Sequence, residues 1–221
     1  MRRKGIFILL IVLIFLFLFF NLTPAAEILN DKFKQFGEFL KKVNHDKKYD
    51  VVVARIGDRD VTLREFELFK RSYVLDGRTV TPEEVLEELK RRTVLKEEAE
   101  KRKITVSDEE VEKAIQDYKE GMENLKKTNP AEYSEFLSYL EGLNMTEEQY
   151  WKSKEIFEIY RKALVTGKVR KAILKELSEK YNLTGNELQK KYRDYIEEEK
   201  AKLKVKILKP ELIGIKNSTD S

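Results

Sequence analysis

The first apolar segment of the chain is an unbroken run at residues 6–20, which follows three basic residues at positions 2–4. A basic flank and a run of this length are typical of a secretory signal peptide, and with its neighbours the run approaches the roughly 17 to 25 residues that span a bilayer. Small residues at positions 25 and 26 offer a cleavage site, whereas the bulky run favours an uncleaved anchor. We predict a signal peptide or transmembrane anchor at residues 1–26, with membrane contact through residues 6–22 and the following chain translocated.

Helical spacing of apolar residues resumes after this segment and predicts an amphipathic helix and a polar linker over residues 27–50. Residues 51–56 are a short β-branched run that ends at a glycine, and residues 203–208 alternate polar and apolar positions. Because a lone strand is unstable, we expect these two segments to pair antiparallel. They would close one multi-helix domain over residues 51–208, followed by a disordered tail at residues 209–221.

One signature of helix starts occurs five times between these strands. A Ser or Thr is followed three residues later by Glu or Gln, and apolar residues flank the pair in the positions of a hydrophobic staple. The pairs are Thr62–Glu65, Thr81–Glu84, Ser107–Glu110, Thr146–Gln149 and Thr184–Glu187. We expect each pair to cap a helix, Pro130 to open a further helix, and Gly167 to break the long helix that begins at Thr146. The predicted fold is therefore mainly α.

Charge and composition narrow the classes of function. Without the three basic residues at positions 2–4, the 44 Lys and Arg become 41, against 40 Asp and Glu, and both signs are interleaved. This mixture argues against a nucleic-acid partner, which usually requires a concentrated basic face. The chain has no Cys and one His, which excludes thiolate chemistry and sites that need two imidazoles. We find no phosphate-binding glycine loop and no acid and base pair, and we expect no cofactor, no metal, no small-molecule substrate and no enzymatic activity.

Several segments resemble the SurA and PrsA type of extracytoplasmic chaperones. Residues 53–62, VARIGDRDVT, are similar to the opening of that family, in which a strand, a glycine-containing turn and a Thr-capped helix follow one another. Residues 85–115 are the most specific match, and residues 142–164 and 195–208 are similar to the next helix pair and to the closing helix and strand.

The resemblance covers residues 51–208 and implies a SurA N-terminal-like domain without the parvulin prolyl isomerase domain. Between Tyr181 and the last strand there is no room for that domain, and the one histidine, His45, lies upstream. Prolyl isomerase activity is therefore the third choice of function, by family name only.

The resemblance also implies binding of unfolded or newly translocated polypeptides without ATP, at the extracytoplasmic face of a bacterial cell membrane, or in the periplasm or medium if the signal is cleaved. Such binding requires an exposed apolar surface with a charged rim. The candidates are Phe136, Tyr139, Leu140, Leu143, Trp151, Phe157 and Tyr160. The alternatives are that these side chains pack the core, and that the protein is a membrane-anchored adaptor for one folded partner.

Overall fold

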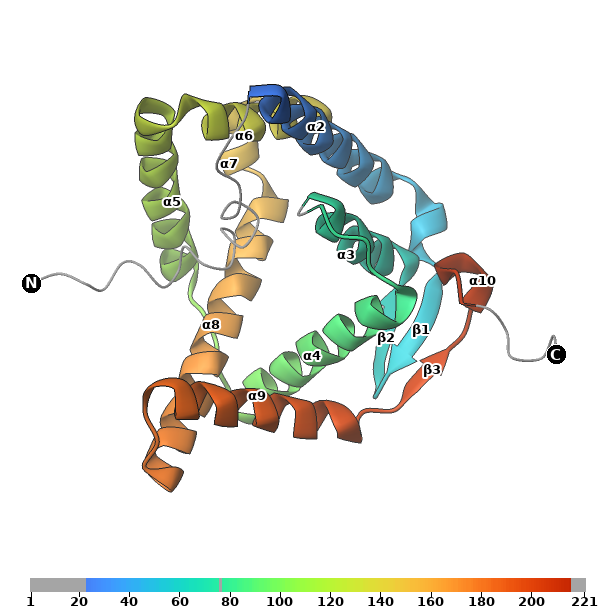
Figure 1. Ribbon diagram of the computed structural model, residues 1–221, viewed down its shortest axis with the longest axis vertical. Helices are drawn as coiled ribbons and strands as arrows, with labels where there is room; N and C mark the ends of the chain where they lie inside the picture. Colours follow the sequence, from blue (N-terminus) through green and yellow to red (C-terminus); the bar gives the residue numbers. More distant parts are fainter. Residues whose placement is uncertain (1–22, 76, 216–221) are drawn as a thin grey trace, which may run out of the picture. The chain divides into compact units, whose positions relative to one another are not determined.

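The computed structural model describes residues 23–75 and 77–215 (Figure 1). These residues form two compact units. Unit 1 contains the described residues up to 47, residues 71–79 and residues 106–164, and unit 2 contains residues 48–70, 80–105 and those from 165 onward. The fold is mainly helical with a small antiparallel sheet, as the sequence predicts.

The predicted anchor at residues 6–22 lies outside the described residues. Within residues 23–75 and 77–215, no helix is long and apolar enough to cross a membrane. Helix α2 (Thr23–His45) covers most of the predicted amphipathic segment, and the short 3-10 helix η2 (Lys47–Asp50) follows it.

Unit 1 is built from α2, α5 (Asp108–Thr128), α6 (Pro130–Leu143), α7 (Glu147–Trp151) and the first turns of α8 (Lys154–Tyr181). Helices α2 and α6 lie against each other at two glycines. A Cβ atom on Gly37 would lie 2.9 Å from the backbone nitrogen of Leu143, and one on Gly142 would lie 2.9 Å from that of Glu38. The two backbones therefore approach more closely than any larger residue would allow.

Unit 2 contains a three-stranded sheet in the order β2–β1–β3, formed by β1 (Val52–Ile56), β2 (Arg59–Thr62) and β3 (Val205–Ile207). The pairing of β1 with β3 is antiparallel, with Ala54 opposite Ile207 and Ile56 opposite Val205. This confirms the predicted pairing of the two terminal strands. The hairpin from β1 to β2 was not predicted, although Gly57 has the positive φ, +57°, that such a tight turn favours.

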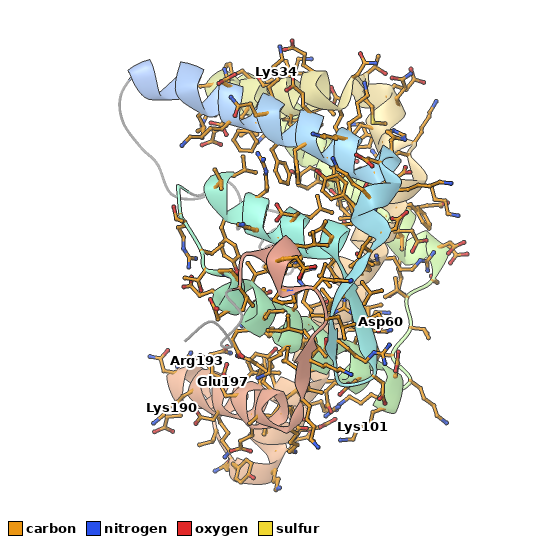
Figure 2. All side chains as sticks on the ribbon, turned by 90° about the vertical axis from the view of Figure 1, so that its right-hand side faces the viewer. Lys34, Asp60, Lys101, Lys190, Arg193 and Glu197 are labelled. Carbon is orange, nitrogen blue, oxygen red and sulfur yellow. The ribbon has the colours of Figure 1, made fainter. Side chains whose placement is uncertain are left out.

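The helices of unit 2 are α4 (Pro82–Lys101), α9 (Gly185–Lys202), α10 (Pro210–Ile213) and the remaining part of α8, together with the start of α3 (Leu63–Leu75). Figure 2 shows Lys190, Arg193 and Glu197 on α9, all of which are exposed. The opposite side of α9 contributes Ile196 to a core with α4 and α8, which consists of Val94, Leu95, Ala99, Val169, Ile173, Leu177 and Ile196.

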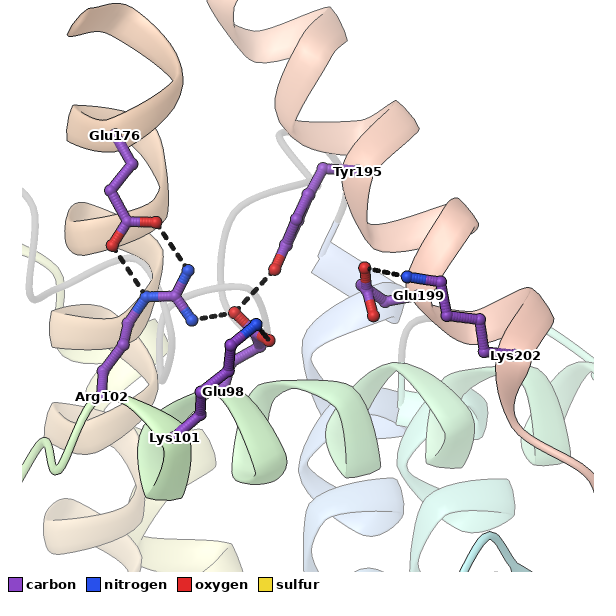
Figure 3. A network of polar contacts seen from close by, with 7 residues as sticks. All are labelled: Glu98, Lys101, Arg102, Glu176, Tyr195, Glu199 and Lys202. Carbon is purple, nitrogen blue, oxygen red and sulfur yellow. Dashed lines mark hydrogen bonds and ion pairs between the residues drawn. The ribbon is translucent and has the colours of Figure 1, made fainter. Parts of the chain in front are cut away.

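A polar network joins the same three helices (Figure 3). The carboxylate of Glu98, whose residue is only 5% exposed, accepts a hydrogen bond of 2.7 Å from the hydroxyl of Tyr195 and pairs with Arg102. Arg102 also donates two hydrogen bonds, of 3.0 and 2.7 Å, to Glu176. These bonds hold the pKa of Glu176 below its ordinary value. The buried carboxylate of Glu98 thus has a hydroxyl and a guanidinium as partners, which offset the cost of removing its charge from water.

The predicted helix caps are largely confirmed. Thr81, Ser107 and Thr146 each form a complete capping box with the residue three positions later. Thr62 accepts a hydrogen bond from the backbone N–H of Glu65, whose side chain pairs with Arg59.

Three sequence predictions are wrong. Helix α9 starts as expected after Thr184, but the Thr184 side chain makes no capping hydrogen bond. Helix α8 continues through Gly167, and the break lies instead at Ser153, whose hydroxyl accepts a hydrogen bond of 3.3 Å from the N–H of Ile156. Residues 210–213 of the expected disordered tail form α10, and Ile213, which is 1% exposed, contributes to the core and stabilises this short helix, whereas residues 216–221 lie outside the described residues.

Candidate functional site

Unit 1 contains a continuous cluster of aromatic rings contributed by α2, α5, α6, α7 and α8. Neighbouring ring centroids are 4.8 to 6.2 Å apart, which is the usual range for favourable aromatic pairs. The eight members are Phe36, Tyr118, Tyr133, Phe136, Tyr139, Tyr150, Trp151 and Tyr160. We refer to them as the aromatic cluster.

Local sequence signals bring the rings of α6 and α7 together. Asn144 ends α6 in the left-handed conformation, with φ of +57°, and Thr146 then caps α7. Because of this short turn, the ring centroid of Phe136 in α6 lies 5.4 Å from that of Tyr150 and 5.6 Å from that of Trp151, both in α7. The cluster is therefore a consequence of two adjacent helix ends.

The seven predicted binding residues all lie in unit 1, but they differ in exposure. Leu140, Trp151 and Tyr160 are buried, with exposures of 4, 7 and 6%. The other four, Phe136, Tyr139, Leu143 and Phe157, are partly buried. The structure thus brings four of the seven into the aromatic cluster, namely Phe136, Tyr139, Trp151 and Tyr160, and none of the seven is fully exposed. Their role in binding polypeptides remains a prediction.

A depression of about 450 Å³ lies beside the cluster, between α5 and the junction of α7 with α8. Its apolar lining residues, which we call its floor, are Ile115, Trp151 and Phe157, and we call the polar lining residues its rim. Its rim carries charges of both signs and polar groups, namely Glu112, Gln116, Lys119, Lys152, Ser153 and Lys154. We call it the apolar depression. Of its apolar residues, Ile115 and Trp151 are only 8 and 7% exposed, and Phe157 is partly buried.

A second depression of about 380 Å³ continues along α5 and shares Gln116 and Lys119 with the first. The other residues that line it are Glu120, Glu123, Asn124, Lys127 and Glu147, all polar. The apolar depression therefore differs chemically from its neighbour, and an apolar side chain of a ligand would favour the former.

Hydrogen bonds orient the edge of the aromatic cluster. The carboxylate of Glu147 accepts bonds from the hydroxyl of Tyr133, at 2.7 Å, and from the indole N–H of Trp151, at 3.1 Å. Desolvation, followed by the bond to Glu147, raises the pKa of Tyr133 to about 12. The Trp151 ring is consequently fixed with its polar edge satisfied, and it lines the depression although the residue is only 7% exposed.

One polar group in the cluster lacks such a partner. The hydroxyl of Tyr160 is buried and makes no hydrogen bond within the part of the chain that the structure describes, and burial raises its pKa. On α6, burial followed by the neighbouring Glu132 raises the pKa of Glu135 to about 7. Neither group has an arrangement that resembles a catalytic pair.

The described residues contain no group of three or more His, Asp or Glu side chains that could hold a metal ion. The predicted site residues did not include Ile115, Tyr118, Tyr133 and Tyr150. Ile115 and Tyr118 belong to the apolar stripe of α5, at a spacing of three residues, and that periodicity was the available signal.

The described residues are mainly helical; one unit contains the aromatic cluster and the apolar depression, and the other contains a small antiparallel sheet. A family model of the SurA-like N-terminal domain matches residues 1–164. The chain therefore belongs to the SurA-like N-terminal domain family, which is a chaperone-type family, and the predicted resemblance is confirmed. No curated protein and no solved structure matches the chain.

Proposed function

We propose that this protein holds unfolded or newly translocated polypeptides by hydrophobic contact outside the cytoplasm, without ATP. The observation that carries the proposal is the apolar depression, in a chain of a chaperone-type family. Its floor offers the partly buried Phe157, beside the buried Trp151, to an apolar side chain of a client, and burial of apolar surface stabilises such contacts at roughly 25 cal/mol per Å².

The depression supports weak and unspecific binding rather than tight binding. It is open to solvent, and its rim carries one carboxylate, that of Glu112, together with the three lysines Lys119, Lys152 and Lys154. Mixed charges keep an apolar surface soluble without selecting one charge pattern in the ligand. A protein with this surface would bind many unrelated unfolded chains.

The test is light scattering of several aggregating client proteins with and without the protein. Suppression of aggregation is expected, and Phe157→Ser should reduce it because Phe157 lies on the floor of the depression and is partly buried. Ile159→Ser is the matched control, since Ile159 is on the same helix, is 48% exposed and does not line the depression. Unchanged aggregation of all clients, together with tight binding of one folded protein, would favour the adaptor instead.

We also propose that residues 6–22 attach the protein to the cell membrane, with the described residues on the extracytoplasmic side. The support is the apolar run with its basic flank. Mass spectrometry of the protein isolated from its native membrane should find the original N-terminus. A new N-terminus near Ala26 would show that the protein is released.

A further inference from the structure

The sheet of unit 2 ends in a strand that is paired on one side. In the order β2–β1–β3, the strand β3 pairs with β1 and has no second neighbour among residues 23–75 and 77–215. All three residues of β3 are exposed, and Val205 and Ile207 are each 37% exposed. An edge strand of this kind has a row of backbone groups available for another strand.

The register identifies these backbone groups. The carbonyl of Lys204 accepts a hydrogen bond of 2.9 Å from the N–H of Gly57, and the N–H of Leu208 donates one of 2.9 Å to the carbonyl of Val53. Hydrogen-bonding residues alternate along an antiparallel strand, so the backbone groups of residues 204, 206 and 208 face β1. The N–H and C=O groups of Val205 and Ile207 therefore face away from the sheet.

Apolar and basic side chains also alternate along this edge. Val205 and Ile207 lie opposite Ile56 and Ala54, on the buried side of β1, whereas Lys206 lies opposite Arg55 on the other side. Arg55 in turn lies opposite Asp60 of β2 and forms an ion pair of 2.7 Å with it. One row across the sheet thus reads Asp60, Arg55, Lys206, or negative, positive, positive.

Lys206 has no ion pair with any carboxylate of the described residues, unlike Arg55 beside it. Lys204 and Lys209 flank it, and both are exposed. Lysines on an edge strand disfavour pairing of two copies, because copies that pair at this edge bring the lysines of one strand close to those of the other. The same lysines attract a strand of opposite charge.

We propose that the outer edge of β3 binds an extended acidic and apolar segment of a polypeptide as a fourth strand. In antiparallel alignment, apolar residues of this segment pair with Val205 and Ile207 and exchange hydrogen bonds with them. An acidic residue then lies opposite Lys206, which ends the row across the sheet, and gives it a partner of opposite charge. The inference deepens the proposed function, on which it rests, by identifying a class of client segment that binds through its backbone.

The probe is a short fluorescent peptide that alternates Val and Glu, titrated into the full-length protein and followed by anisotropy. Lys206→Glu should weaken its binding by about three- to tenfold, since an opposite-charge cross-strand pair becomes a like-charge pair. The same variant should bind a peptide that alternates Val and Lys more tightly than the wild-type protein does. Lys190→Glu is the control, because Lys190 is exposed on α9 and distant in sequence from the edge (Figure 2).

Backbone methylation tests the geometry independently of charge. A peptide with N-methylated Val residues should lose binding by about tenfold or more, because those N–H groups face β3, whereas N-methylated Glu residues face away and should be tolerated. Two results would overturn the proposal. One is an equal loss of affinity with both methylated peptides, and the other is a Lys206→Glu variant that binds the Val–Glu and Val–Lys peptides with the same affinities as the wild-type protein.

The two proposals fail in different ways. If the alternating peptide binds as described but aggregation of no client is suppressed, the result supports the binding site at the edge of β3 and refutes the proposed holding function. If Phe157→Ser abolishes suppression while neither peptide series discriminates, the holding function stands and the edge site does not.

Discussion

The close approach of α2 and α6 leads to a sharp prediction for Gly142→Ala. A Cβ atom at position 142 would meet the backbone nitrogen of Glu38 at 2.9 Å and would come still closer to the carbonyl oxygen of Lys34. Both are backbone atoms of α2, so no side-chain rotation can relieve the overlap. Helix α2 would have to move away from α6 as a whole.

Two opposing effects set the magnitude. Alanine favours the helical conformation over glycine by about 1 kcal/mol. Overpacking of a tight contact usually costs about 1 to 3 kcal/mol, and a clash between two backbones belongs at the upper end of that range. We therefore expect Gly142→Ala to lower the free energy of unfolding by about 1 to 2 kcal/mol.

Gly121→Ala provides the matched control. Gly121 lies in α5 of the same unit, and a Cβ atom there would meet nothing within 4 Å. Only the helix propensity changes, so this variant should be more stable than wild type by up to about 1 kcal/mol. Urea unfolding followed by circular dichroism measures both. If Gly142→Ala gained as much stability as Gly121→Ala, the described docking of α2 on α6 would be wrong.

Three further predictions concern buried polar groups. The raised pKa of Glu135, about 7, means that its contribution to stability is complete below about pH 4.5 and is lost as the pH rises through about 7. Glu135→Gln should therefore be more stable than wild type by about 2 kcal/mol at pH 8 and about equal to it at pH 4, measured by urea unfolding. Arg102→Met should cost about 2 to 3 kcal/mol in the same measurement because it removes a partner of the buried Glu98, whereas Lys202→Met, at an exposed pair, should cost under about 0.5 kcal/mol. Tyr160→Phe should raise stability by about 1 kcal/mol, since it removes a buried hydroxyl without a partner, and a loss of stability would reveal a partner.

The fold was predictable where a signal lies within a few neighbouring residues, or where a segment has only one candidate partner in the sequence. A capping box such as Ser107 with Glu110 contains its own hydrogen-bond partners, so the helix start follows from four residues. The pairing of β1 with β3 was predictable because a short strand needs a neighbour. The break before α8 was missed because Ser153 has no Glu or Gln three residues later, and its hydroxyl alone forms the cap.

The site was less predictable because exposure depends on packing between helices. The stripe of α6 shows that Tyr139 and Leu140 are apolar positions, but burial depends on which helix covers them. Here α2 approaches to backbone contact at Gly142, and no local pattern indicates this. Trp151 was a candidate for the exposed apolar surface; it borders the apolar depression, but it is only 7% exposed and its indole N–H is already bound to Glu147.

The two proposed binding modes differ in their dependence on salt. Contact with Phe157 in the apolar depression buries apolar surface, which salt does not screen and which sulfate strengthens. Attraction between Lys206 and an acidic residue is an exposed charge pair, and the screening length falls from about 10 Å at 0.1 M to about 3 Å at 1 M salt. We therefore expect sodium sulfate to preserve suppression of aggregation while it weakens binding of the alternating Val and Glu peptide by a few fold. Parallel loss of both activities would show that electrostatic attraction dominates client binding, and the apolar depression would then not be the main contact.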